Sequence, residues 1–144
     1  MKRLILTALA VAVAAPSLAI SPAAAAPAAS PAASPAGTWR NARDSVRIRV
    51  APCGAGLCGT VVAADQRARD DAAAGGTDRL IGTQLFRDFR RGAGGVWQGT
   101  VFVPDLGQEF AGTLSLQGAN TLVGTGCVLP GLCKSQTWTR VAAR

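Results

Sequence analysis

The sequence of 144 residues contains no histidine and no tyrosine, and aromatic residues make up only 5% of it. Histidine is the commonest general base near neutral pH, so its absence argues against most acid–base and nucleophilic enzymes. A phosphate-binding glycine loop, a nucleophile elbow and a Cys-x-x-Cys redox motif are also missing. We therefore predict a protein that is not an enzyme, with no catalytic residues, no cofactor and no bound metal.

Carboxylates are the remaining candidates for chemistry, and half of them lie in a charged connection between residues 65 and 79. Exposure to solvent is enough to explain the two adjacent carboxylates of Asp70 and Asp71, without a functional role. A calcium site in this connection is an alternative, since carboxylate oxygens suit that ion. Interleaved arginines argue against such a site, whose ligands would be Asp65, Asp70, Asp71 and Asp78.

The N-terminal residues have the pattern of a cleaved secretory signal peptide, predicted for residues 1–25. Lys2 and Arg3 form a basic start, an apolar run reaches Ile20, and alanine-rich cleavage sites follow. A single membrane anchor is the alternative, but a spanning helix usually needs about 20 apolar residues. We expect a periplasmic or secreted protein whose mature form has no transmembrane segment.

Residues 26–36 are almost wholly alanine, proline and serine and predict a disordered linker, with the folded domain at residues 37–142. Removing Lys2 and Arg3 from the formal charge of +7 leaves about +5. The remaining arginines form no dense patch, which together with export argues against a nucleic-acid partner.

The segment 45–64 predicts a β-hairpin closed by a disulfide. Val46, Ile48 and Val50 alternate with two arginines, as in a strand with one apolar face. Four cysteines in an exported chain favour two disulfides, and pairing each cysteine with its neighbour is the simplest of three connectivities. A four-cysteine zinc site is the alternative. The predicted disulfides are Cys53 with Cys58 and Cys127 with Cys133.

The whole domain predicts an all-β fold, a small eight-stranded antiparallel up-and-down barrel with meander topology. Most of the strands are joined by tight turns, apart from a short helix at 66–74 in the long connection. Closure into a barrel removes the exposed sheet edges, and a twisted two-sheet sandwich is the alternative. Glycines inside the strands would permit the sharp coiling. The expected strands are 37–40, 45–51, 58–64, 80–90, 96–103, 108–116, 121–128 and 134–141.

Several segments resemble the bacterial family of small exported proteins called domain of unknown function 2147, over residues 37–141. The segments are Gly37-Thr38-Trp39, Val46-Arg47-Ile48, Pro52-Cys53-Gly54, Leu57-Cys58-Gly59, Gly126-Cys127 and 135–141. The resemblance implies a lipocalin-like, or calycin, barrel. In calycins a Gly-x-Trp on the first strand packs against an arginine near the end of the last, which assigns barrel closure to Trp39 and Arg140. The family's loop motif survives only as Asp78-Arg79-Leu80 and Gly82, so any activity of that loop is altered or lost.

The leading functional hypothesis is a non-enzymatic module that binds a small apolar or amphipathic ligand in the mouth of the barrel. The candidate ligand or partner contacts are Trp97, Trp138, Asp78 and Arg79, although packing is the simpler role for both tryptophans. The alternative is an envelope protein-interaction or structural module that binds an anionic component through its basic surface.

Overall fold

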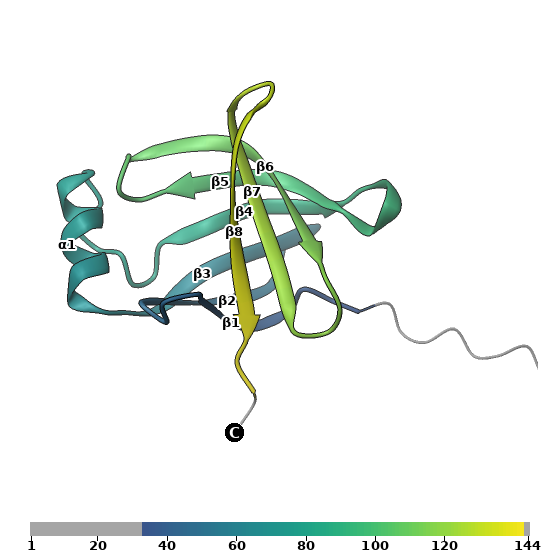
Figure 1. Cartoon of the computed structure of the whole chain (residues 1–144), viewed down its shortest axis with the longest axis horizontal. Helices are drawn as coiled ribbons and strands as arrows, with labels where there is room; N and C mark the ends of the chain where they lie inside the picture. Colours follow the sequence, from purple (N-terminus) through teal and green to yellow (C-terminus); the bar gives the residue numbers. More distant parts are fainter. Residues whose placement is uncertain (1–32, 143–144) are drawn as a thin grey trace, which may run out of the picture. The chain divides into compact units, whose positions relative to one another are not determined.

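The chain folds into a closed barrel of eight antiparallel strands (Figure 1). The computed structural model describes residues 33–142, so the predicted signal peptide lies outside the described residues. Each strand pairs with the next along the chain, and β1 pairs with β8. The barrel predicted from the sequence is therefore confirmed, and the two-sheet sandwich is excluded. The strands are β1 (Gly37–Asn41), β2 (Val46–Cys53), β3 (Gly56–Ala64), β4 (Gln84–Arg91), β5 (Trp97–Val103), β6 (Gln108–Leu116), β7 (Thr121–Leu129) and β8 (Leu132–Arg140).

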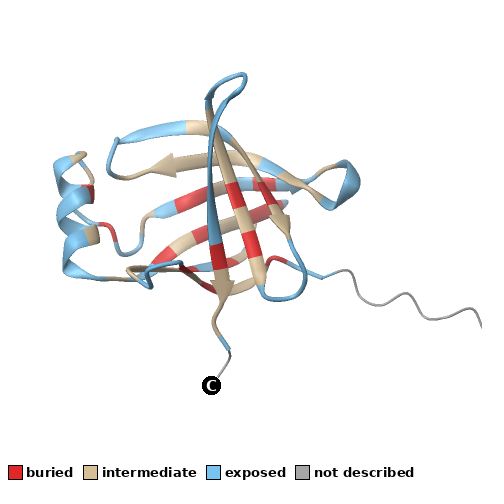
Figure 2. Cartoon of the chain, in the orientation of Figure 1, coloured by how far each residue is buried: buried red, intermediate tan, exposed pale blue. Residues whose placement is uncertain are grey.

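The side chains of a strand alternate between its two faces, so a strand with alternating apolar residues points them into the barrel and its polar residues outward. On β2, Ile48 and Val50 are buried while Arg49 between them is exposed. On β6, β7 and β8, the buried positions lie toward one end of the barrel, away from the tip of the β7–β8 hairpin (Figure 2). This closed end carries the start of β1 and the turns between β2 and β3, β4 and β5, and β6 and β7. Its fully buried large side chains include Trp39, Ile48, Phe89, Leu114 and Leu122.

The opposite end, called the open end here, carries the helix α1 (Gln66–Ala74) in the connection from β3 to β4. The sequence predicted this helix correctly. Asp65 caps it, because its carboxylate accepts a hydrogen bond of 2.8 Å from the backbone N–H of Ala68. Within residues 33–142, no helix combines the length and the hydropathy that crossing a bilayer requires.

The helix is held against the turn between β5 and β6. The Thr77 hydroxyl donates a 3.0 Å hydrogen bond to the carbonyl of Pro104. At Gly75, the residue after α1, an added Cβ atom would collide with the backbone of Asp105. Because only a glycine allows this approach, α1 rests directly on the β5–β6 turn and covers part of the open end.

Strand β4 begins later than the sequence suggests. The prediction of a strand over 80–90 is wrong for its first four residues, because Gly82 has φ +91° and the Thr83 N–H closes a turn onto the carbonyl of Leu80. Leu80 is nevertheless buried, because it packs under α1 rather than within the sheet. The turn between β2 and β3 is tighter than predicted, since the strands extend to Cys53 and from Gly56.

Both predicted disulfides are present, each within one hairpin. Cys53 is bonded to Cys58 across the β2–β3 hairpin, and Cys127 to Cys133 across the β7–β8 hairpin. No cysteine thiol is free within residues 33–142, which excludes the four-cysteine zinc site.

The last residues of the segment predicted as a disordered linker contact the closed end of the barrel. Pro35 is fully buried, and its carbonyl accepts a 2.8 Å hydrogen bond from the indole N–H of Trp39. The carbonyls of Ser34 and Ala36 accept hydrogen bonds from Arg140. Residues 34–36 carry no charge or aromatic group, and the barrel holds them because it supplies donors for their backbone carbonyls.

Candidate binding cavity

The barrel is not filled at its open end. From Leu132 to Thr137, every residue of β8 is exposed, although one face of the strand points inward. Lys134 and Gln136 lie on that inward face, on the same side as the buried Trp138. A packed core would bury these inward side chains, so their exposure shows that the interior here is open to solvent.

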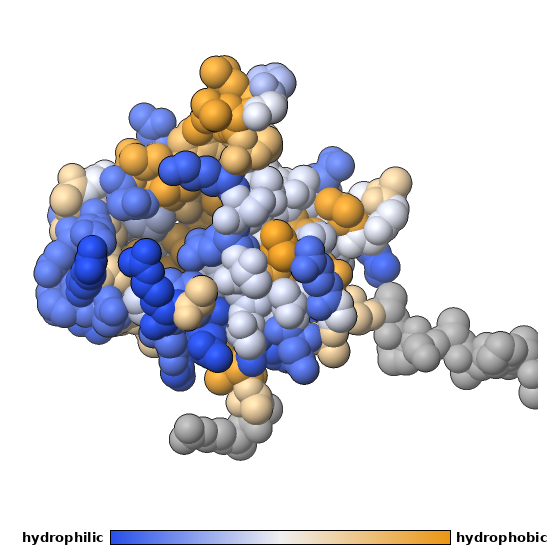
Figure 3. All heavy atoms as spheres, in the orientation of Figure 1, coloured by the Kyte–Doolittle hydropathy of each residue, from blue (hydrophilic) through white to orange (hydrophobic). Residues whose placement is uncertain are grey.

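Two adjoining chambers occupy this space. The hairpin chamber, beside the β7–β8 hairpin, has a volume of about 850 Å³, and the helix chamber, beneath α1, has about 280 Å³. They share six lining residues and form parts of one cavity: Phe86, Val101, Val103, Asp105, Gln136 and Trp138. In a space-filling view, recessed apolar atoms are visible between α1, the β5–β6 turn and β8 (Figure 3). The volume of the hairpin chamber alone lies within the usual range for small-molecule sites.

Aromatic rings separate the cavity from the closed end. The ring of Phe86 meets the indole of Trp138 edge to face, with centroids 5.9 Å apart, and meets Phe89 in the same manner at 5.6 Å. At Gly59, an added Cβ atom would lie only 2.6 Å from the Phe86 ring. The glycine therefore allows Phe86 to lie flat against β3, where it forms the floor of the cavity.

Glycines also set the width of the cavity on the opposite wall. At Gly112, Val101 already fills the place that a side chain would take. At Gly126, on the neighbouring strand β7, an added Cβ atom would meet Val101 and Phe110 only at 3.8 to 3.9 Å, an ordinary contact distance. Gly126 thus leaves the wall of the hairpin chamber open, and a larger side chain there would project into the cavity.

A column of hydrogen-bond donors lines the β8 wall. Lys134, Gln136 and Trp138 face the hairpin chamber, and successive members are roughly 7 Å apart because a strand rises about 3.3 Å per residue. The indole N–H of Trp138 is buried and has no hydrogen-bond partner within residues 33–142. Burying a donor without a partner is unfavourable, so an acceptor from a ligand would satisfy it.

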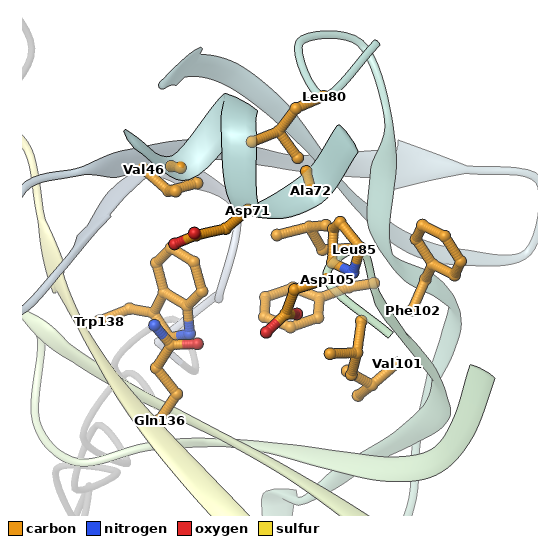
Figure 4. A pocket seen from close by; sticks show the side chains of 14 residues that line it. Val46, Asp71, Ala72, Leu80, Leu85, Val101, Phe102, Asp105, Gln136 and Trp138 are labelled. Carbon is orange, nitrogen blue, oxygen red and sulfur yellow. The ribbon is translucent and has the colours of Figure 1, made fainter. Parts of the chain in front are cut away.

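Two carboxylates lie on the α1 side of the cavity. Asp71 projects from α1 and Asp105 from the β5–β6 turn, facing the wall that holds Gln136 and Trp138 (Figure 4). Asp71 also forms an exposed ion pair of 3.9 Å with Arg67. Within residues 33–142, no three acidic or cysteine side chains lie close enough together to hold a metal ion. The chain thus does not assemble the calcium site considered from the sequence.

The β1–β2 turn adds a cation to the rim of the hairpin chamber. Arg43 lines this chamber, together with Lys134. Its neighbour Asp44 is bound by Arg47 at 2.7 Å, and this hydrogen bond holds the pKa of the Asp44 carboxyl below its ordinary value. Arg47 thus engages Asp44, whereas Arg43 faces the chamber.

The structure separates the residues that the sequence singled out for contact. Trp138 lines both chambers, whereas Trp97 is half-buried at the start of β5, toward the closed end. Asp78 and Arg79 are exposed between α1 and β4 and line neither chamber. Sequence reasoning missed Lys134 and Gln136. Their signal was four consecutive polar residues at 134–137 within a strand, a run without a buried face.

A closed eight-stranded meander with one packed end and one open cavity defines a lipocalin-like barrel. It resembles the solved structure of the protein HP1028 from the human pathogen Helicobacter pylori, described as belonging to the lipocalin family, with a TM-score of 0.56. The two share 10% sequence identity, and the similarity covers 74% of this chain and 82% of that one, which establishes a common fold.

The chain belongs to the DUF2147 family, described as an uncharacterized protein conserved in bacteria, over residues 37–140. The resemblance noted in the sequence is thereby confirmed. No curated protein matches the chain.

Proposed function

We propose that this protein is an exported, non-enzymatic binding module that holds a small amphipathic ligand in the cavity at the open end of its barrel. The supporting observation is the cavity itself, whose mainly apolar wall carries a buried indole N–H without a partner. Lipocalin-like barrels of this strand number are wide enough for one small ligand. Two hairpin disulfides are in keeping with an oxidising compartment, the periplasm or the exterior. The predicted signal peptide at residues 1–25 would direct the chain there and then be cleaved.

The ligand would place its apolar body against the floor and the β5–β7 wall, where Phe86, Val101 and Phe110 lie. An oxygen of the ligand would accept a hydrogen bond from Trp138, with the amide of Gln136 beside it. Lys134 and Arg43 at the rim would favour a polar or anionic group at the mouth over a second apolar end.

Gly126→Leu tests this assignment because it fills the cavity without straining the sheet. The added side chain would occupy the hairpin chamber, so it should abolish both the fluorescence response of anilinonaphthalene sulfonate and its displacement by dodecanoate. Native mass spectrometry of the exported protein would show whether a copurified ligand is lost at the same time. The free energy of unfolding should stay within about 1 kcal/mol of the parent protein, since no existing contact is removed.

Ser115→Leu is the matched control, because this β6 position faces outward between Leu114 and Leu116. It adds the same apolar group outside the barrel and should leave probe binding unchanged. If the unmodified protein binds neither the probe nor dodecanoate and carries no copurified molecule, ligand enclosure is excluded.

Binding of an anionic envelope component is the second candidate function. One observation favours it: the sequence from Ala111 to Arg144 contains lysine and arginine but no acidic residue. This part of the chain includes most of β6 and all of β7 and β8. Because it carries no negative charge, the side of the barrel that these strands form would repel an anionic surface less than the other side does.

A further inference from the structure

The tip of the β7–β8 hairpin carries the two most exposed large apolar side chains within residues 33–142. The hairpin tip is defined here as Val128 to Leu132, the five residues enclosed by Cys127 and Cys133. Its Val128, Leu129 and Leu132 have exposed fractions of 48%, 63% and 60%. The hairpin projects beyond the barrel (Figure 1), and its end is the most hydrophobic protrusion in the space-filling view (Figure 3).

These side chains are held in place rather than free to fold back onto the barrel. Cys127 and Cys133 are directly opposite in the β7–β8 pairing, and their disulfide closes the base of the tip. Next to it, the hydroxyls of Thr125 and Ser135 form a 2.7 Å hydrogen bond across the two strands. A tip that is fixed in an exposed geometry loses little conformational entropy when it enters an apolar environment.

Shape and charge indicate what covers the tip. A five-residue protrusion offers far less area than the roughly 800 Å² per partner of a stable protein interface. A lipid surface can instead surround the protrusion on all sides. The tip itself is uncharged, Lys134 lies two residues after its last residue, and Arg43 lies on the same rim of the hairpin chamber. The one acidic group lining this chamber is Asp105, in the facing turn beside the exposed Leu106.

The apolar surface of the tip also continues into the cavity. Val128 and Leu132 line the hairpin chamber as well as forming part of the tip, and Leu106 lines the same chamber from the opposite turn. We propose that the hairpin tip inserts into the surface of an anionic lipid bilayer and so places the open end of the barrel at the membrane. This docking goes beyond ligand enclosure and does not depend on whether the cavity is occupied.

Leu129→Ser tests the docking, because Leu129 is 63% exposed and lines neither chamber. The exported protein with both disulfides formed is sedimented with vesicles of phosphatidylcholine, alone or mixed with phosphatidylglycerol. We expect binding to the mixed vesicles, and a loss of about tenfold in the partition coefficient for Leu129→Ser. Val62→Ser is the matched control: Val62 is 45% exposed on β3, four strands away around the barrel, and its replacement should change nothing.

A second pair of variants reports the position of the tip directly. The emission of the tryptophan introduced by Leu129→Trp should shift to shorter wavelength when vesicles containing phosphatidylglycerol are added. The emission of the tryptophan introduced by Val62→Trp should not shift. The proposal is overturned if the parent protein does not bind the mixed vesicles, or if the two serine variants lose binding equally. It is also overturned if Leu129→Ser instead disrupts a dimer in sedimentation equilibrium, because the tip would then be covered by a second copy.

Discussion

The guanidinium of Arg140 lies over the ring of Trp39, 4.1 Å from its centroid, and joins the last strand to the first. Arg140 also donates hydrogen bonds of 2.8 to 3.0 Å to the carbonyls of Ser34, Ala36 and Ala119. Glycine is required at position 37, beside Arg140. The φ of Gly37 is +137°, and a Cβ atom there would collide with the Arg140 guanidinium. One side chain thus holds β1, the β6–β7 turn and the chain before β1 together. We propose that it closes the barrel.

Arg140→Lys should destabilise the protein by about 2 kcal/mol, although it keeps the positive charge. A lysine ammonium cannot form the planar set of hydrogen bonds or stack on the indole in the same way. The free energy of unfolding in urea measures the effect. Arg91→Lys is the control, because Arg91 is exposed at the end of β4, where the same replacement is made away from the contact between the first and last strands. Equal stability of the two variants would contradict a closing role for Arg140.

Regular features of this fold could be predicted because they depend on short-range patterns. Val46, Ile48 and Val50 are spaced by two, which is the repeat of a strand with one buried face. Cys127 and Cys133 are close in sequence, so a turn alone is enough to bring them together. By contrast, Leu80 and Ile81 look like the start of a strand, yet the backbone of Gly82 turns the chain there.

The cavity could not be predicted because its size depends on contacts between distant residues. Phe86 lies flat only because Gly59 on β3 leaves room for its ring, and Val101 occupies the space beside Gly112 on β6. The sequence contains these glycines but not the information on which neighbour fills each gap. Only Gly126 remains open enough to widen the hairpin chamber, and nothing in its local sequence distinguishes it from Gly112.

Gly75→Ala should loosen α1 from the open end of the barrel. The new methyl group would collide with the backbone of Asp105, and relief of this overlap requires α1 to move away from the β5–β6 turn. Overpacking of this kind costs about 1–3 kcal/mol. Hydrogen exchange should therefore accelerate in α1 while the amides of the closed end, such as Leu114, keep their protection.

Ala73→Ser is the control for this variant, because Ala73 is exposed on α1. It alters the helix slightly without adding an atom toward Asp105, and should leave exchange in α1 nearly unchanged. If Gly75→Ala also leaves the α1 amides as protected as in the parent, the contact between Gly75 and the β5–β6 turn does not hold the helix in place.

Trp138→Phe separates the role of the indole N–H from that of the ring. The N–H makes no hydrogen bond within residues 33–142, so its removal breaks no bond that stabilises the described domain. The phenyl ring retains most of the apolar contact with Phe86. We therefore expect a free energy of unfolding that changes by about 1 kcal/mol or less, as for other conservative core replacements.

Ligand affinity should respond differently from stability in the same variant. A ligand whose oxygen accepts from the Trp138 N–H loses that bond, so dodecanoate or dodecanol should bind about tenfold more weakly to Trp138→Phe. Dodecane, which has no acceptor, should displace the fluorescent probe equally well from both proteins. A variant that weakens all three displacing ligands to the same extent would show that the indole serves as apolar surface, and that its N–H takes no part in recognition.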